Sequence, residues 1–161
     1  MVALYDRALP QVYGYLLPRC GSASIAEEVT AETFMAAVTA AKRGTVADLT
    51  IAWLVGVARH KLVDHWRRME REERSLSAVH GGRDDVDDPW DAHLDADVAH
   101  AALSRLPSPQ RAALTLRYLD GLPVADVANL LGRSVHATET LLVRARAAFR
   151  RAYEESESND A

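Results

Sequence analysis

Residues 121–146 read GLPVADVANLLGRSVHATETLLVRAR, and this stretch decides the fold class. Its spacing predicts a short helix over residues 123–131, a turn at Gly132, and a longer helix that Ser134 caps and that continues to about Tyr153. A short helix, a glycine-containing turn and a longer helix together form a helix-turn-helix pattern.

The longer helix has a broad apolar side and a second side that carries polar groups near its start. In a helix-turn-helix, the N-terminal part of the second helix enters the major groove of DNA. We therefore predict base contacts from the exposed set His136, Glu139, Thr140 and Val143. Neighbouring arginines are expected to hold phosphates, which position a helix without reading sequence; they are Arg133, Arg144, Arg146 and Arg150. The alternative is an ordinary corner of two helices with a solvated polar face.

Upstream of this motif, two more helices are predicted. One covers residues 98–106, and the next begins with Ser108 as N-cap and Pro109 at its first position. The second helix stops at the Asp120–Gly121 turn. Residues 98–153 therefore form one helical domain, and residues 154–161 form an acidic tail.

Residues 75–97 separate this domain from the first half of the chain. The stretch contains Gly-Gly, Pro and a cluster of Asp, and it has no periodic apolar face. Such composition is typical of a linker, so we expect an acidic flexible connection.

Residues 1–74 also show helical periodicity and are expected to form the other small domain. A first helix is expected over residues 3–17, and it contains Pro10, a residue type that can break or kink a helix. Ser24 and Glu27 have the spacing of a capping box that opens a second helix to about Ala41. Its apolar set is Ile25, Val29, Phe34, Met35 and Val38.

A third, long helix starts near residues 52–68, which read AWLVGVARHKLVDHWRR, and continues toward Arg74. Basic residues interleaved with aromatic ones suit single-stranded nucleic acid, where bases stack on rings and phosphates meet cations. For Trp53 and Trp66 we favour the alternative, that both belong to the core. His60 and Asp64 share one face, but no third ligand type accompanies them, so no metal site is predicted.

The net charge of −4 conceals a segregated pattern. Residues 42–74 hold eight Lys and Arg against five Asp and Glu, and residues 133–151 hold five Arg against one Glu. Residues 84–97 hold seven Asp and no basic residue. Because a polyanion responds to charge within about 8 Å at physiological salt, local charge outweighs the net value. The pattern favours a nucleic-acid-binding protein.

Other features narrow the class of protein. The single cysteine, Cys20, excludes a disulfide framework, and no apolar run approaches the ~18 residues of a membrane span. The N-terminus lacks the pattern of a signal peptide. We therefore expect a cytoplasmic protein without membrane insertion. No Ser-His-Asp, Cys-His or paired-acid arrangement stands out, so no enzyme is predicted.

Three motifs, in this order and spacing, resemble a bacterial sigma factor of the extracytoplasmic-function (ECF) group in the sigma-70 superfamily. They read IAEEVTAETFMAAV, AWLVGVARHKLVDHWRR and LPSPQRAALTLRYLDGLPVADVANLLGRSVHATETLLVRARAAFR. The resemblance covers about residues 4–74 and 98–152. It implies an all-α, non-enzymatic protein without a cofactor that directs core RNA polymerase to promoter DNA. The first domain would read and open the −10 element, and the second would read the −35 element as duplex.

The same resemblance implies protein partners. The helix over residues 25–41 would dock on the clamp helices of the polymerase β′ subunit through Glu28, Glu32 and Phe34, and the β flap would be a second polymerase contact. An anti-sigma factor is a further expected partner. Ala31 stands where the family often has Gln, which weakens or replaces one contact.

The resemblance also assigns DNA-facing residues. Near the −10 element it implies a set of mostly basic side chains: Lys42, Arg43, Arg59, His60, Lys61, Arg67 and Arg68. At the −35 element Glu139 stands where the family often has Lys or Arg, so we expect an unusual −35 sequence. Two rival hypotheses are a helix-turn-helix regulator that never joins polymerase, and a helical interaction protein or enzyme that binds no DNA and uses its basic faces for an acidic partner.

Overall fold

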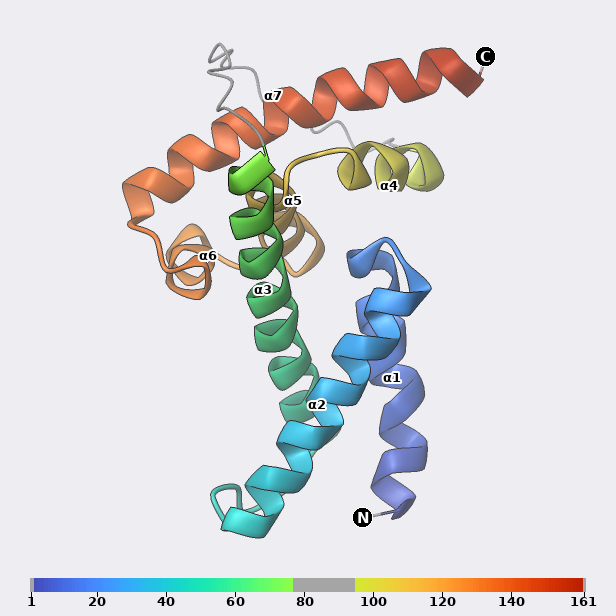
Figure 1. Cartoon of the computed structure of the whole chain (residues 1–161), viewed down its shortest axis with the longest axis vertical. Helices are drawn as coiled ribbons and strands as arrows, with labels where there is room; N and C mark the ends of the chain where they lie inside the picture. The colour runs from blue at the N-terminus through green and yellow to red at the C-terminus, as the bar shows by residue number, and fades with distance from the viewer. Residues whose placement is uncertain (1, 77–94, 161) are drawn as a thin grey trace. The chain divides into compact units, whose positions relative to one another are not determined.

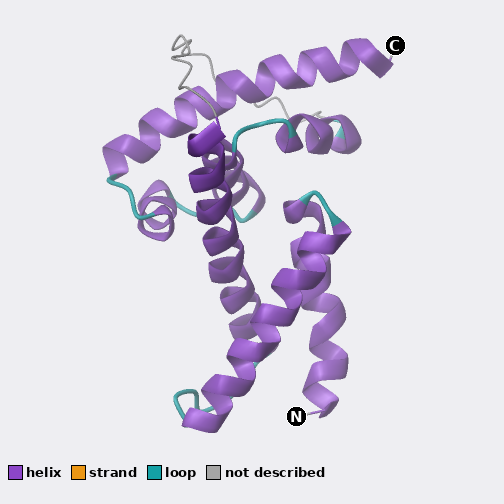
Figure 2. Ribbon diagram, viewed as in Figure 1, coloured by secondary structure: helices purple, strands orange, loops and turns teal. Residues whose placement is uncertain are grey.

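The computed structural model describes residues 2–76 and 95–160, and within them every regular element is a helix (Figures 1 and 2). The helices in chain order are α1 (Val2–Cys20), α2 (Ala23–Arg43), α3 (Ile51–Leu76), α4 (Ala96–Ser104), α5 (Ser108–Leu114), the π-helix η1 (Thr115–Leu119), α6 (Val124–Leu131) and α7 (Val135–Asp160). The expected all-α fold is confirmed. Most of the expected linker lies outside the described residues.

The chain divides into two compact units, Met1–His65 and Trp66–Ala161. The division falls inside α3, so the last part of this helix is described with the second unit. Within residues 2–76 and 95–160, no helix has an apolar stretch long enough to cross a membrane.

The core of the first unit follows a four-residue repeat. Its most buried positions include Ala8, Val12 and Leu16 of α1, Val29, Thr33 and Ala37 of α2, and Leu54, Ala58 and Leu62 of α3. Side chains four positions apart lie on one side of a helix, so each helix buries a single stripe. Helices α1 and α2 lie side by side along much of their length (Figure 1).

The ends of α1 and α2 differ from the sequence prediction at two points. Pro10 lies inside α1 on an exposed position, and α1 continues past it to Cys20. Helix α2 starts two residues earlier than expected, because Ser22 rather than Ser24 is the N-cap and its side chain accepts from the amide of Ile25 at 3.5 Å. The end of α2 is set by Gly44, which has the left-handed φ of 64° that favours glycine.

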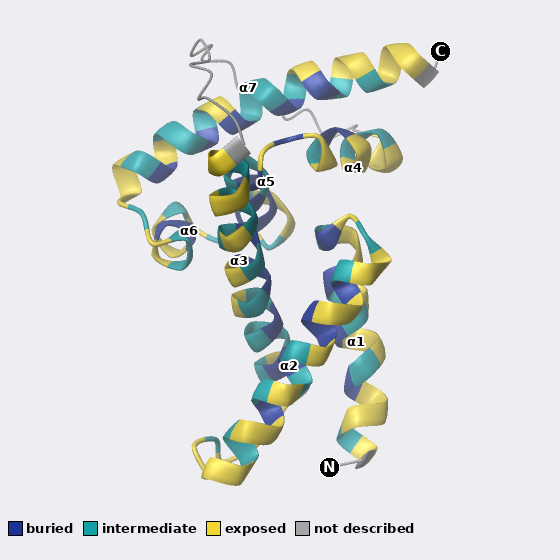
Figure 3. Cartoon of the chain, viewed as in Figure 1, coloured by how far each residue is buried: buried dark blue, intermediate teal, exposed yellow. Residues whose placement is uncertain are grey.

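The second unit is built on α7, which packs against α4, α5 and α6. Its buried cluster consists of Ala102, Leu106, Ala113, Leu114, Leu142, Ala145, Phe149 and Ala152. Four of these residues come from α7 at helical spacing. Figure 3 shows dark blue, buried patches along this helix. Four of the eight buried residues are alanines, so much of this core is made of small side chains.

The helix-turn-helix forms as predicted from its local signals. Helix α6 ends at Gly132, whose φ is 65°, and α7 is capped by Ser134, whose hydroxyl accepts from the amide of Ala137 at 3.1 Å. The preceding helical segment ends at Asp120 and Gly121, as expected, although its last turn is the π-helix η1.

Two sequence predictions for this unit were wrong. Ser108 is the first residue of α5, and the N-cap is Pro107, which makes no side-chain capping bond. Residues 154–160, expected as a tail, continue α7 as helix. An ion pair of 2.7 Å between Arg105 and Glu155 links this extension to the end of α4.

Candidate functional sites

The start of α7 presents a polar face. His136 and Glu139 are exposed, and Thr140 and Val143 are half-buried. These four positions lie on one side of the helix by their spacing, and the interposed Thr138 is fully buried, with its hydroxyl donating to the Ser134 carbonyl at 2.8 Å. The face predicted to meet DNA bases is therefore turned away from the core.

The arginines near this face differ in their surroundings. Arg144 is exposed. Arg146 donates to the Tyr118 hydroxyl at 3.0 Å, and Tyr118 also lies 5.8 Å from the Arg117 guanidinium carbon. Arg133 forms an ion pair of 2.9 Å with Glu70 of α3. The predicted phosphate contacts thus include groups that already have protein partners.

Helix α3 separates an apolar side from a basic side. Trp66 is buried at 3% exposure, and Trp53 is half-buried, which places Trp66 in the core as favoured above. His60 and Arg68 are exposed. Two other predicted DNA-facing residues have contacts of their own: Arg59 Nε donates to the Tyr15 hydroxyl at 3.4 Å, and Arg67 Nη2 donates to the Leu130 carbonyl at 2.7 Å.

Basic residues from two helices meet at a surface hollow in the first unit. Arg43 lies in the last turn of α2 and Lys61 on α3, and both line a hollow of about 510 Å³ that Glu32 also borders. Lys42 is exposed beside Arg43. Arg43 and Lys61 belong to different helices, so the fold brings these two cations to one hollow.

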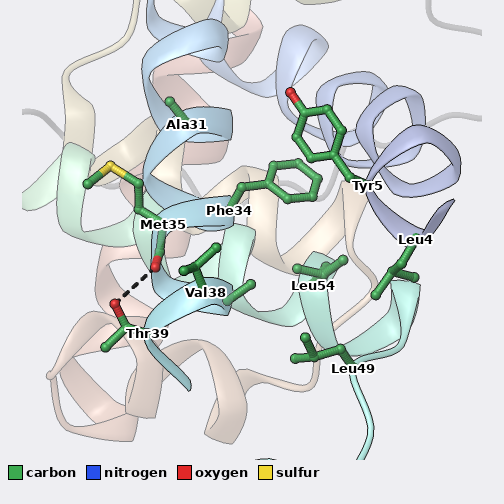
Figure 4. Close-up of a pocket in the computed structure, with 10 residues that line it drawn as sticks. Leu4, Tyr5, Ala31, Phe34, Met35, Val38, Thr39, Leu49 and Leu54 are labelled. Carbon is green, nitrogen blue, oxygen red and sulfur yellow. Dashed lines mark hydrogen bonds between the residues drawn. The ribbon is translucent and has the colours of Figure 1, made fainter. Parts of the chain in front are cut away.

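An apolar groove lies along α2 on the first unit (Figure 4). Its volume is about 360 Å³, and its lining includes Tyr5, Phe34, Met35 and Val38. The Tyr5 and Phe34 rings meet edge to face with centroids 4.9 Å apart, so Phe34 is held in place by α1. Glu28 is exposed on the same helix, and Glu32 is half-buried.

The predicted apolar set of this helix is not all core. Met35 is 70% exposed and Val38 40% exposed, whereas the core takes Thr30 and Thr33 instead. Both threonine hydroxyls donate to carbonyls four residues earlier, at 2.6 and 2.8 Å, so their burial leaves no unpaired hydroxyl. Residue type alone gave no sign that Met35 would face outward; its place on the helical wheel opposite Val29 and Thr33 could have shown it.

The described residues 2–76 and 95–160 contain no cluster of three His, Cys, Asp or Glu side chains able to hold a metal ion.

Comparison with known proteins finds a family match in each half of the chain. Residues 4–72 match the family described as Sigma-70 region 2, and residues 96–149 match Sigma-70, region 4. The ECF RNA polymerase sigma factor BldN of Streptomyces coelicolor is 34% identical over 148 residues, which cover 88% of this chain and 56% of BldN. The ECF sigma factor SigC of Mycobacterium tuberculosis is 32% identical, with 77% of this chain and 68% of SigC covered.

A solved structure shares the fold. It is the sigma factor RpoE in complex with the anti-sigma factor NepR from Bartonella quintana, with a TM-score of 0.56 and 21% sequence identity over 93% of this chain and 94% of that one. The two region matches, in order along one chain, include the residues assigned above to polymerase or DNA, except Arg150, which lies one residue past the second match. The protein therefore belongs to the ECF group of RNA polymerase sigma factors within the sigma-70 family.

Proposed function

We propose that this protein binds core RNA polymerase and directs it to promoters through two separate DNA-reading surfaces. Residues of α2 and α3 act at the −10 element, and the start of α7 acts at the −35 element. The observation that carries this proposal is the presence of both sigma-70 regions in one chain, each with an outward face of suitable chemistry. A DNA-binding regulator that never joins polymerase has no need of both sigma-70 regions, whereas a polymerase-dependent factor uses both.

The polymerase contact is assigned to the outward face of α2. Glu28, Glu32 and Phe34 are its predicted contacts, and by helical spacing the exposed apolar residues Met35 and Val38 lie between Glu32 at one edge of this face and Phe34 at the other. Large apolar side chains seldom stay in water without reason, and a helix face that mixes them with acids suits a protein partner. This face would meet the clamp helices of the β′ subunit.

The −10 contact is assigned to the hollow between the C-terminal part of α2 and Lys61 of α3, and to the basic side of α3. Arg43 and Lys61 supply positive charge in the lining of the hollow, and Lys42 is the exposed neighbour of Arg43 in the chain. The remaining members lie along α3; they are Arg59, His60, Arg67 and Arg68. Base flipping costs a few kcal/mol, and cations around a preformed hollow offset that cost when a strand is melted.

The −35 contact is assigned to the exposed start of α7. His136, Glu139, Thr140 and Val143 are placed to meet base edges, and a carboxylate can accept a hydrogen bond from the amino group of cytosine. Arg133, Arg144 and Arg146 are the phosphate contacts. Glu139 would otherwise repel the backbone, so its presence favours a −35 element with a cytosine at the matching position.

An anti-sigma partner is also proposed. The sigma factor of the same fold from Bartonella quintana was solved with such a partner. In this chain, the apolar groove beside Phe34 offers a surface that an inhibitor could cover and so exclude polymerase. BldN is longer than the matched part, since the chain spans 56% of it. These assignments therefore concern the two regions present here.

Run-off transcription tests the proposed function. Core polymerase is supplied with a library of bacterial promoters, with and without this protein. New promoter-specific transcripts, with shared −35 and −10 sequences, are the expected result. Sequence-specific binding to duplex DNA with no new transcripts would instead favour a helix-turn-helix regulator that never joins polymerase.

A further inference from the structure

The side chain of Tyr118 holds an arginine of α7. Arg146 Nη1 donates to the Tyr118 hydroxyl at 3.0 Å, although the two residues are 28 positions apart in the chain. Tyr118 lies in η1 and Arg146 in α7, so the bond joins the segment before the helix-turn-helix to its second helix. Both residues belong to the second unit. The contact is therefore part of the fold of that unit.

The π-helix η1 sets the direction of Tyr118. The amide of Asp120 donates to the Thr115 carbonyl, five residues back, at 3.1 Å, whereas an α-helix would bond four residues back. In an uninterrupted α-helix, Tyr118 would lie one turn after Leu114 and share its side, and Leu114 is only 2% exposed. The wider turn leaves Tyr118 at the surface, with 38% exposure. Widened turns of this kind are frequent at functional sites.

A second arginine lies beside the ring of Tyr118. The guanidinium carbon of Arg117 is 5.8 Å from the ring centroid, within the range of a cation–π contact. Arg117 Nη1 also donates to the Leu122 carbonyl at 3.2 Å, which fixes this arginine next to the ring. Two cations therefore lie beside one tyrosine at the surface of the second unit.

Arg146 lies at the flank of the face proposed to read bases. It follows Glu139 by seven residues, about two turns and about 10.5 Å, and Val143 by three, so helical spacing places it on their side of α7. The major groove of DNA is about 12 Å wide. A side chain at this distance from the base contacts is therefore suited to the phosphates that border the groove.

The bond to Tyr118 preorganises Arg146 for such a phosphate. A free arginine side chain samples many rotamers and loses that freedom when it binds, which weakens binding. Because Arg146 is already held by Tyr118, it loses less. A guanidinium carries several N–H donors in a planar fork, so one bond from Nη1 leaves donors for a phosphate. Water competes for both groups at an exposed hydrogen bond, so its contribution to folding is small and orientation is its larger effect.

We propose that Tyr118 is a positioning residue for −35 binding, which acts through Arg146 on a backbone phosphate beside the base-reading face. Tyr118 reads no base in this role, because phosphate contacts carry no sequence information directly. The inference rests on the proposed function, since the −35 role of α7 gives Arg146 its target. It adds to that function a residue from the segment that precedes α6.

A double-mutant cycle tests whether Tyr118 acts through Arg146. The variants are Tyr118→Phe, which removes only the hydroxyl, Arg146→Gln, which removes the charge, and the two combined. Tyr153→Phe is the matched control, because Tyr153 lies in the same unit and its hydroxyl accepts from the amide of Asp95 at 3.0 Å. Each protein is assembled with core polymerase. Its affinity for a duplex promoter recovered by run-off transcription is then measured over a range of salt concentrations.

The expected losses differ in size and in salt dependence. Arg146→Gln should weaken binding about tenfold and reduce the slope of log affinity against log salt by about 1. Tyr118→Phe should weaken binding about threefold, equally for all −35 sequences, and keep most of the slope because the charge remains. The combined variant should bind like Arg146→Gln alone, since Tyr118 then has no arginine to hold. Tyr153→Phe should bind like wild type.

Three results would overturn the positioning role. The combined variant could bind about threefold more weakly than Arg146→Gln, which would mean that Tyr118 acts on DNA independently of Arg146. Tyr118→Phe could bind like wild type, or Tyr153→Phe could lose as much affinity as Tyr118→Phe. Should Tyr118→Phe fail to fold in a thermal melt, Tyr118→Met, which also lacks the hydroxyl, takes its place in the cycle.

Failure of the proposed function has a different signature. Absence of promoter-specific transcripts from the wild type overturns that function. The same cycle is then measured with the protein alone on duplex DNA of mixed sequence, where a phosphate contact predicts the same coupling between Tyr118 and Arg146. Wild-type protein that binds neither DNA overturns both proposals.

Discussion

The outward face of α2 and the start of α7 are both helix surfaces turned away from a core, but their chemistry is opposite. On α2, the exposed groups include Met35 and Val38 beside a groove of about 360 Å³. On α7, they are His136 and Glu139, with arginines nearby. The first surface suits a protein and the second suits a polyanion, so exposure alone does not specify the kind of partner.

The largest expected effect tests whether α7 has two distinct sides. Leu142 is 2% exposed in the second unit, so Leu142→Ala should lower the free energy of unfolding by about 2–5 kcal/mol through lost burial and a cavity. Chemical denaturation measures the change. His136→Ala on the exposed side should stay within about 0.5 kcal/mol of wild type, and similar losses for the two variants would erase the distinction.

The next effect tests the protein-facing character of α2. Met35→Asp places a charge in the exposed apolar surface, and it should weaken binding to core polymerase by at least about 30-fold, as the loss of a strong contact residue does. Fluorescence anisotropy with labelled protein measures this affinity. Ala23→Asp adds the same charge to an exposed position in the first turn of α2 and should leave binding unchanged.

A smaller effect tests whether Glu139 reads a base. Glu139→Ala should change the base preferred at one position of the −35 element, by about 1–3 kcal/mol, because the carboxylate is the proposed acceptor for cytosine. Selection from random promoters, followed by sequencing of the transcribed ones, measures the preference. An unaltered −35 preference would mean that Glu139 is a solvated residue that reads no base. The start of α7 would then lack the base-reading role that distinguishes it from the outward face of α2.

The smallest effect concerns the phosphate contacts. Arg144→Ala should weaken DNA binding severalfold and equally for all sequences, and it should reduce the slope of log affinity against log salt by about 1. A salt titration of binding to duplex DNA measures both. Arg151→Ala, which removes an exposed arginine farther along α7, provides the comparison and should keep the wild-type slope.

Local signals explain which parts of the fold were predictable. Gly132 and Ser134 act on their own neighbours, through a left-handed φ and a cap bond three residues away, so the turn could be read from sequence. Ser22 competes with Ser24 for the start of α2, and the choice depends on the turn formed by Gly21, whose φ is 70°. Local rules therefore predicted a serine cap at the start of α2 but not which of the two serines provides it.

Long-range contacts explain what was missed. Glu73 and Ser108 are 35 residues apart, and Arg105 and Glu155 are 50 apart, so neither pairing has a periodic signature. The residues of the candidate surfaces were found through family resemblance, but their engagement with one another was not. Met35 shows the same limit, because a core and a docking face draw on the same apolar residue types.

Because α7 extends to Asp160, one helix carries positive charge toward its start and negative charge at its end. Its first part, with the preceding turn, carries five arginines over residues 133–151, and its end carries four acids over residues 154–160. Along a rod of roughly 39 Å, this separation creates a dipole that the field of DNA turns before contact. Under the proposed function, we expect encounters with DNA to begin with the arginine-bearing part of α7 forward, so that the acidic end raises the share of collisions in a productive orientation.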